Sequence, residues 1–411
     1  MKIVKTVGII CEYNPFHLGH AAHIENTRFL LGDEVGVVCV MSPNFVQRGD
    51  FAVFNKHARA KMAIINGADL VLELPTPFAL SSAESFAMGG VYILEKLGVC
   101  DYISFSSESG SVESLKTAAQ VALSDDFREN LRPWLSRGVS YATALQKAAE
   151  AVMGASADVF STPNNVLGIE YIKAIYELSS KMEPVTMKRV GGEHDSDTGF
   201  SASAVRLRLR ETECKTGGQR NRPPASLLDL LPESSLSVCE DEIRLGCGPV
   251  FLENAEQALL SRLRAIEDYS EILNTSGGLE HKFAKLAKTE PTVEDILRGA
   301  KSKRFVMSRL RRILICAALG ITKDYTKNPP PYIRVLAASK VGTDMLSSAR
   351  KKASLPIITK PASVYKLGGF AEQMFKLEAS ATDLYSLAYQ DVPSRAGGSE
   401  WRVSPFILNE K

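Results

Sequence analysis

The chain of 411 residues is 45% hydrophobic and 23% charged, which is typical of globular proteins with room for two or three domains. Its formal net charge of +2 is too small to indicate a polyanionic partner, so any nucleic-acid surface must be local. The seven cysteines include no pair at CxxC spacing, which argues against a zinc knuckle or a disulfide framework and for a reducing compartment.

The N-terminal stretch 1–14 has a basic start, but Glu12 breaks its apolar run and no small-residue cleavage site follows. It is therefore interpreted as a first strand rather than a signal peptide. No apolar run approaches the roughly 20 residues of a membrane helix, so no membrane partner is predicted. A cytoplasmic protein is expected.

Strand-like and helix-like segments alternate through the first half. The continuous apolar run at 34–41 is typical of a strand that is buried on both faces. In the helical segment 55–68, Ala58, Met62 and Ile65 fall on one side, and the lysines and arginines are expected opposite them. The predicted strands are 5–11, 34–41, 69–74, 101–107 and 184–190, and the predicted helices are 20–31, 55–68, 81–98 and 165–179.

This alternation requires crossover connections and predicts an α/β fold with a Rossmann-like, doubly wound, mostly parallel sheet. Ligands bind such sheets outside the carboxyl ends of the strands. Glycines and prolines without periodicity indicate a linker at 214–226 between a first domain, 1–213, and an appended, mainly helical domain, 227–411. In the second domain a helix is predicted at 304–320, and a proline-rich break follows at 327–339.

Three of the six histidines lie in the stretch GIICEYNPFHLGHAAH, where the first strand ends and a helix begins. Unpaired N–H groups at a helix start form an anion site, and Gly19 would let a phosphate approach the backbone. His17 and His20 are three positions apart, so both can project from the same side of the first turn. They can donate hydrogen bonds to phosphate and, as cations, stabilise charge on an α-phosphate under attack. The pattern indicates nucleotidyl transfer, in which positioning dominates.

Two other interpretations of these histidines remain. They could ligate a metal ion, although no cysteine or carboxylate lies at a useful spacing, and no metal site is predicted. They could also only cap the helix or pack against it.

The HxGH pattern resembles the nucleotidyltransferase superfamily, which includes the class I aminoacyl-tRNA synthetases. The longer strings EYNPFHLGH at 12–20 and SPNFVQRGDFAVFNKHARAKMAIINGADLVLELP at 42–75 closely resemble the bacterial tRNA(Met) cytidine acetate ligase family. Similarity continues through 105–110, 161–175 and 199–211, so it covers the first half strongly and the helical half loosely.

The resemblance implies that acetate is activated with ATP to acetyl-adenylate and transferred to N4 of the wobble cytidine of elongator tRNA(Met), with magnesium bridging the phosphates. His17 and His20 would be catalytic. The ATP-binding residues carried over by position are Ile10, Cys11, Glu12, Tyr13, Asn14, Pro15, Phe16, His17, Leu18, Gly19, His20, His23, Ser106, Asn164, Arg189 and Val190. The family usually has glycine where this chain has Ser106, which could crowd the adenosine or donate a hydrogen bond to the ribose.

The stretch 202–210 resembles the superfamily's late phosphate motif, which implies that Ser201, Ser203 and Arg206 bind the β- and γ-phosphates. Without the resemblance, a serine-capped helix with its arginines facing solvent is an equally good interpretation of 202–210. Arg48 lies in a polar loop, and loops beyond strand ends line the site in this fold, so Arg48 could bind pyrophosphate or the substrate carboxylate, or could only anchor the loop. Asn164 could only initiate the helix that follows it.

Basic residues on the predicted helix 304–320 and just before it are candidates for tRNA phosphate contacts. The candidates are Lys303, Arg304, Arg309, Arg311 and Arg312. A solvated helix face is the alternative. For the whole chain, the competing functions are a small-molecule adenylyltransferase that does not need RNA, and a non-catalytic RNA-binding protein with a regulatory nucleotide pocket.

Overall fold

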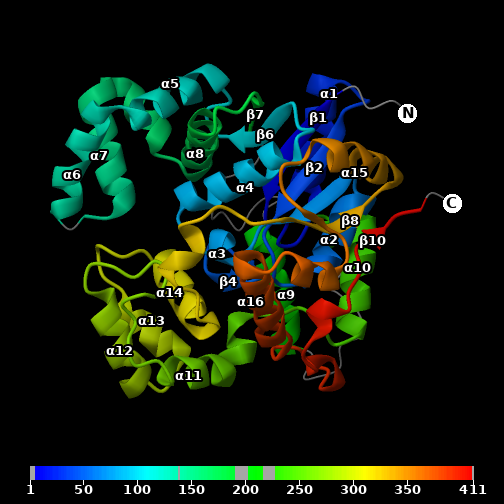
Figure 1. Cartoon of the computed structure of the whole chain (residues 1–411). Coiled ribbons are helices and arrows are strands. Elements are labelled where there is room, and N and C mark those ends of the chain that lie inside the picture. The colour runs from blue at the N-terminus through cyan, green and yellow to red at the C-terminus, as the bar shows by residue number, and fades with distance from the viewer. Residues whose placement is uncertain (1–4, 138, 190–201, 216–226, 410–411) are drawn as a thin grey trace.

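The computed structural model describes residues 5–137, 139–189, 202–215 and 227–409. Within them, eight strands form one mixed sheet in the order β10-β8-β5-β2-β1-β6-β7, with β9 beside β8 (Figure 1). Neighbouring strands are parallel except β5 and β8, which are antiparallel. The strands are β1 (Thr6–Cys11), β2 (Gly36–Met41), β5 (Leu70–Glu73), β6 (Tyr102–Ser107), β7 (Glu183–Lys188), β8 (Ile333–Ala338), β9 (Ile357–Ile358) and β10 (Phe406–Ile407).

The predicted α/β fold is confirmed by the five parallel strands and the helices that cover both faces of the sheet. Every residue of β1, β2 and β5 is buried, because apolar side chains on both faces pack under helices. One core contains α1 and α2, and the other contains α4 and α8. The helices are α1 (Leu18–Leu31), α2 (Lys56–Ile65), α4 (Ala83–Leu97) and α8 (Pro163–Glu177), with the short α3 (Thr76–Ala79) before α4.

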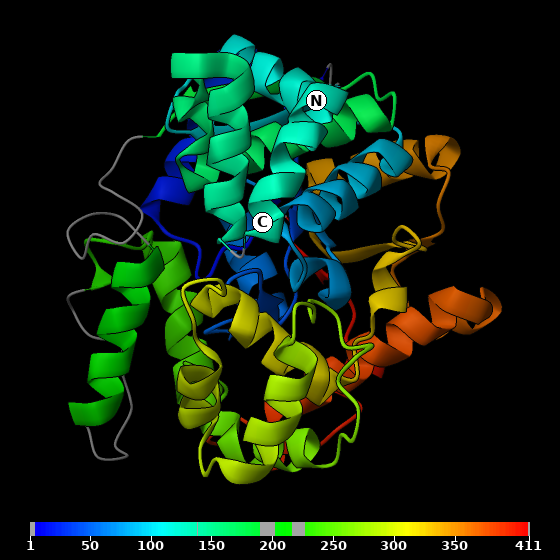
Figure 2. The ribbon, with the colours of Figure 1, turned by 90° about the vertical axis from the view of Figure 1, so that its left-hand side faces the viewer.

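A helical group between β6 and β7 was not predicted from the sequence. It consists of α5 (Val112–Leu123), α6 (Asp125–Ser136) and α7 (Tyr141–Met153). Figures 1 and 2 show α5–α7 in cyan and green, away from the yellow helices of the C-terminal half.

The second half is mainly helical among its described residues. Its helices are α9 (Ala202–Lys215), α10 (Glu233–Arg244), α11 (Glu256–Arg264), α12 (Leu279–Thr289), α13 (Val293–Ala300), α14 (Met307–Leu319), α15 (Lys340–Lys352) and α16 (Gly369–Ser386). The proline-rich break predicted at 327–339 is wrong in its second part, because residues 333–338 form the fully buried strand β8. This strand pairs with β5, so the second half contributes to the main sheet. The domain boundary stays a prediction, and residues 216–226 of the proposed linker lie outside the described part.

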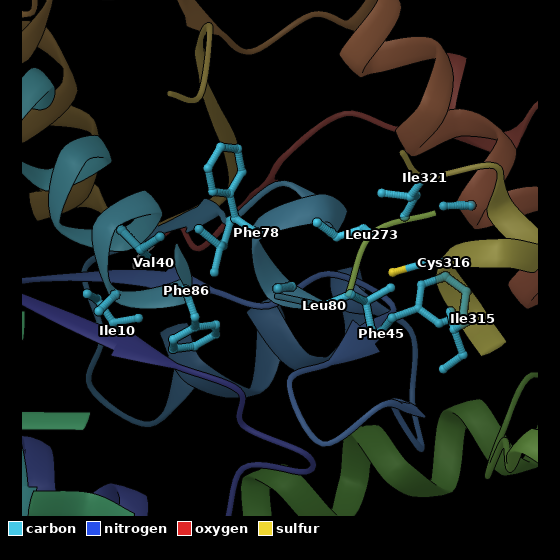
Figure 3. Packing of buried hydrophobic residues seen from close by; sticks show 14 of the residues in the cluster. Ile10, Val40, Phe45, Phe78, Leu80, Phe86, Leu273, Ile315, Cys316 and Ile321 are labelled. Carbon is cyan, nitrogen blue, oxygen red and sulfur yellow. The ribbon is translucent and has the colours of Figure 1, made fainter. Parts of the chain in front are cut away.

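One apolar core joins the sheet to the C-terminal helices. Figure 3 shows Ile10 of β1, Val40 of β2 and Phe86 of α4 in one cluster that also includes Ile315 and Cys316 of α14. The position of α14 relative to β1 and β2 is therefore fixed by packing.

A small hairpin, β3 (Phe45–Val46) and β4 (Asp50–Phe51), lies directly against α14. Gly49 has a φ of 75°, and a Cβ atom there would lie 2.5 Å from the backbone nitrogen of Arg312. Only glycine fits both this conformation and this approach. The hairpin therefore connects the end of the sheet to the helical half.

A cluster of buried ionised groups joins the two halves of the chain. Lys56 and Arg334 both form ion pairs with Glu73 and with Glu400, and all four side chains are at most 3% exposed. Two cations face two anions, so the charges balance in the interior. Among the described residues, none of the helices combines the length and apolar character needed to cross a membrane.

Candidate active site

The turn between β1 and α1 holds its two histidines by backbone hydrogen bonds. The Gly19 N–H donates to His17 Nδ1 at 3.0 Å, and the His17 N–H donates to His20 Nδ1 at 3.2 Å. The two rings are stacked with their centroids 3.7 Å apart. Because each Nδ1 accepts a hydrogen bond, the neutral rings carry their protons on Nε2. The turn therefore presents two N–H donors side by side.

Both imidazoles are neutral at physiological pH. Burial, with smaller contributions from Arg189 and Arg206, lowers the pKa of His17 to about 3. Burial, followed by the neighbouring His17, also lowers the pKa of His20 well below its usual range. The cationic form that the sequence suggested is thus disfavoured, and the pair acts through N–H donors instead.

His23, the third histidine of the turn, lies behind this pair. Its Nε2 is 3.1 Å from Ser104 Oγ, which in turn contacts Thr27 Oγ1 at 2.9 Å. Burial lowers the pKa of His23 to about 4, so it is also neutral. Its ring nitrogen is engaged with β6 rather than directed to an anion.

The loop that begins at Glu12 is held by Arg59 of α2. The guanidinium of Arg59 donates to the carbonyl oxygens of Glu12 at 2.5 Å and Phe54 at 2.9 Å, and also to Ser42 and Pro43. Tyr13 has a φ of 45°, a left-handed conformation that a bulky residue seldom adopts. The expectation that the basic residues of this helix face solvent is wrong for Lys56 and Arg59, which are both buried.

The turn opens into a cavity of about 750 Å³ at the carboxyl ends of β1, β6 and β7, as predicted for this class of sheet. The predicted residues that line it are Ile10, Cys11, Glu12, Tyr13, Asn14, His17, Gly19, His20, His23, Arg48, Ser106, Asn164, Arg189, Ser203 and Arg206. Five cationic side chains line it, namely Arg48, Lys188, Arg189, Arg206 and Arg311. This excess of positive charge in the lining favours the binding of a polyanionic ligand.

Other predicted residues support the turn or lie outside the described part. Phe16 is buried and packs against Tyr13 and His20, Pro15 is also buried, and the Leu18 N–H donates to Leu230 O. Val190 and Ser201 lie outside the described residues.

Asn164 is oriented by a residue that sequence reasoning missed. Its Nδ2 donates to Glu108 Oε1 at 2.6 Å, and the Asn165 N–H donates to Glu108 Oε2 at 2.9 Å. Burial alone would raise the pKa of Glu108, but these hydrogen bonds outweigh it and lower the pKa. Glu108 therefore caps α8 as an ionised carboxylate. Ser106, on the same strand end, lines the cavity.

Arg206 of α9 closes the cavity from the side of the second half. Its Nη1 donates to Asn14 O at 2.9 Å, and its Nη2 donates to Ser203 Oγ at 3.0 Å. The guanidinium thus holds the turn while facing the cavity.

The basic residues at α14 divide into two groups. Arg309 donates to Asn274 O and Ser276 Oγ, and the buried Arg312 donates to Gln47 O. Arg311 lines the cavity, whereas Lys303 and Arg304 are exposed. The predicted contact of these basic residues with RNA stays a prediction, and Lys303, Arg304 and Arg311 are the candidates kept for it below.

Four of the residues that build the site gave no clear signal in the sequence. Lys188 ends a strand, Met307 and Ser308 begin α14, and Glu108 lies in FSSESG, which also resembles the family named above. Their side chains meet only because distant segments fold together.

Both the sequence and the fold of the chain are similar to those of known proteins. Residues 4–400 match the family model described as HIGH Nucleotidyl Transferase. A relative from Acetivibrio thermocellus, described as tRNA(Met) cytidine acetate ligase, is 35% identical over 420 residues, which cover 98% of this chain and 100% of the relative. A relative from Caldanaerobacter subterraneus subsp. tengcongensis with the same description is 37% identical over 398 residues, covering 94% and 96% of the two chains. The crystal structure of Thermotoga maritima TmcAL bound with alpha-thio ATP has a TM-score of 0.89 and 34% identity, covering 98% of this chain and 100% of that one.

Proposed function

The chain belongs to the HIGH nucleotidyltransferase family and, within it, to the tRNA(Met) cytidine acetate ligases, and from this premise we propose that it acetylates N4 of the wobble cytidine of elongator tRNA(Met). ATP and acetate are the co-substrates, and acetyl-adenylate is the intermediate. The observation that carries the proposal is the stacked pair of neutral histidines, whose donors lie in a cavity lined by five cations.

In the first step an acetate oxygen attacks the α-phosphorus of ATP. The new bond joins that oxygen to phosphorus, the bond to the bridging oxygen breaks, and pyrophosphate leaves. His17 and His20 donate from Nε2 to the α-phosphate as negative charge grows on its oxygens. Arg48 and Arg206 bind the departing phosphates by charge-assisted hydrogen bonds.

We assign the nucleoside end of ATP to the side of the cavity formed by β6, β7 and α8. Ser106 and Asn164 supply polar groups there, and Glu108 fixes the amide of Asn164 so that its oxygen can accept a hydrogen bond. Phe105 and Leu167 supply apolar surface on the same side. Arg189 completes the pocket beside His17.

In the second step the N4 amine attacks the acetyl carbonyl, the bond from the carbonyl carbon to the phosphate oxygen breaks, and AMP leaves. The tRNA reaches the cavity from the side of α14, where Lys303, Arg304 and Arg311 bind its phosphates. The protein therefore acts where tRNA and ATP are available, in the cytoplasm.

Magnesium is proposed only as an ion that accompanies ATP. Among the described residues, no group of three or more histidine, cysteine or acidic side chains could hold a metal ion. Magnesium is commonly held by substrate phosphates with few protein ligands. No protein cage for the ion is assigned, and neither step above depends on one.

The test uses purified protein, ATP, radiolabelled acetate and unmodified elongator tRNA(Met). ATP-dependent labelling of the RNA, mapped by nuclease digestion and mass spectrometry to the wobble cytidine, is the expected result. Acetate-dependent release of pyrophosphate without any RNA labelling would support an adenylyltransferase with another acceptor. Binding of ATP and tRNA without turnover would support a non-catalytic protein.

A further inference from the structure

Glu12 is the only carboxylate among the described residues that line the cavity. Around it lie the cationic residues Arg48, Lys188, Arg189, Arg206 and Arg311. A lone acid in a basic cavity weakens the binding of a triphosphate, so its presence calls for a chemical role.

The side chain of Glu12 is turned toward the β3–β4 hairpin. Its Oε1 accepts the Gln47 N–H at 2.8 Å, and Gln47 O accepts from Arg312 of α14 at 2.9 Å. The backbone oxygen of Glu12 is held separately by Arg59. Both ends of the residue are therefore fixed, and the carboxylate lies between the histidine turn and α14. Its second oxygen takes no part in these hydrogen bonds.

The other basic candidates in the described lining cannot accept a proton at neutral pH. His17 and His20 use Nδ1 to accept backbone N–H groups, so their Nε2 atoms already carry protons. The lysine and arginine side chains are cationic donors. His23 contacts Ser104 through Nε2.

We propose that Glu12 is the proton acceptor for the N4 amine in acyl transfer, an inference that rests on the proposed function. As N4 bonds to the acetyl carbon, the nitrogen becomes cationic. The Glu12 carboxylate takes one N4 proton as the bond from carbon to the phosphate oxygen breaks, AMP leaves, and the proton then passes to water. The step needs no other reactant. The position of the carboxylate, on the side of the cavity nearest α14, is where the acceptor arrives in the proposal above.

The experiment measures the two steps separately with Glu12→Gln, which keeps an oxygen that can accept the Gln47 N–H. Acetate-dependent exchange between ATP and labelled pyrophosphate reports the first step. Single-turnover transfer of labelled acetyl to tRNA(Met) reports the second. We expect the ratio of the transfer rate to the exchange rate to fall by about 100-fold or more relative to wild type, the usual effect of removing a general base. The matched control is Glu25→Gln, at an exposed position of α1.

A second variant completes the test. Glu12→Asp keeps a carboxylate on a shorter stem, so an intermediate ratio of transfer to exchange is expected. Equal loss of exchange and transfer in both variants, or unchanged transfer in Glu12→Gln, would overturn the assignment. Failure of the wild-type protein to label tRNA, with exchange intact, would instead overturn the proposed acceptor and the assignment together.

Discussion

Arg59 of α2 and Glu12 at the end of β1 are joined by a hydrogen bond of 2.5 Å from the guanidinium Nη1 to the carbonyl oxygen. The same guanidinium donates to Phe54 O and Ser42 O, so one buried side chain fixes the ends of two neighbouring strands. The residues that follow Glu12 form the histidine turn. The geometry of the nucleotide site therefore depends on an arginine that lines none of it.

Arg59→Lys is predicted to impair both stability and ATP use. The lysine retains the charge, but its single ammonium group cannot donate to the four carbonyl oxygens that the planar guanidinium reaches. Each carbonyl left buried without a hydrogen-bond donor costs about 1–3 kcal/mol of stability. The free energy of unfolding, from urea titration, should fall by at least that amount, and the KM for ATP in pyrophosphate exchange should rise. Lys61→Gln on the same helix is the control. A variant with wild-type stability and KM would show that the fork does not hold the turn.

His17→Ala and His20→Ala are each predicted to reduce acetate-dependent pyrophosphate exchange by about 100- to 1,000-fold, because each removes one preorganised donor to the α-phosphate. His281→Ala, at an exposed position of α12, should have no effect. Because burial lowers the pKa of His17 to about 3, its protonation should not reduce exchange between pH 8 and 5. Exchange that requires a protonated group with a pKa near 6.5 would contradict the neutral pair.

Glu108→Ala is predicted to weaken ATP binding without abolishing chemistry. The variant removes the cap of α8 and frees the amide of Asn164, at a cost of about 0.5–2 kcal/mol in stability. Titration calorimetry should show weaker ATP binding, while exchange at saturating ATP stays within a few-fold of wild type. Glu113→Ala, at the exposed start of α5, is the control, since its carboxylate pairs with Lys116 on the surface. Equal ATP affinity in both variants would argue against an orienting role.

Glu378→Gln is predicted to flatten the dependence of stability on pH. Burial, together with the neighbouring Glu73, raises the pKa of Glu378 to about 8, so the folded protein holds a proton that the unfolded chain releases above its ordinary value of 4.5. The stabilisation is complete below pH 4.5 and is lost as the pH rises through 8. Wild type should lose up to about 1.4 kcal/mol per pH unit more than the variant in that window, measured by urea titration at several pH values. Parallel stability curves would contradict a neutral Glu378.

Lys303→Gln combined with Arg304→Gln is predicted to weaken tRNA binding uniformly. The slope of log K against log salt should fall by about 0.7–0.9 for each phosphate that the variant no longer neutralises. Arg312→Gln should instead lower stability by about 1–3 kcal/mol, because Gln47 O loses its buried donor. If Arg312→Gln changes the salt dependence of tRNA binding and the Lys303–Arg304 double variant does not, Arg312 binds RNA and the exposed pair does not.

The parts of the fold that depend on local pattern could be predicted. The strands β1, β2 and β5 are apolar runs, and helices such as α4 begin at a serine cap and end at a glycine with φ of 73°. The sequence pattern did not predict the strand β8, because three prolines precede the strand and Arg334 interrupts its apolar run. The ion pairs of Arg334 with Glu73 and Glu400 allow that charge to be buried, and no local signal reveals partners so far along the chain.

The candidate site could likewise be predicted only where it depends on local sequence. The histidine turn could be predicted, since it follows the first strand and parallel strands bring their carboxyl ends to one edge of the sheet. Arg59 was assigned to solvent because arginine is usually exposed, and only the geometry of four carbonyls explains its burial. The basic residues near α14 differ only in what packs against them, which sequence does not state.

The most direct test of the proposed chemistry uses acetate labelled with heavy oxygen at both carboxylate positions, with ATP, unmodified tRNA(Met) and wild-type protein. If acetate attacks the α-phosphorus and the amine then breaks the bond between carbon and oxygen, mass spectrometry should find one heavy oxygen in AMP and none in pyrophosphate. Heavy oxygen in pyrophosphate or inorganic phosphate, or acetylated tRNA with unlabelled AMP, would contradict the acetyl-adenylate route.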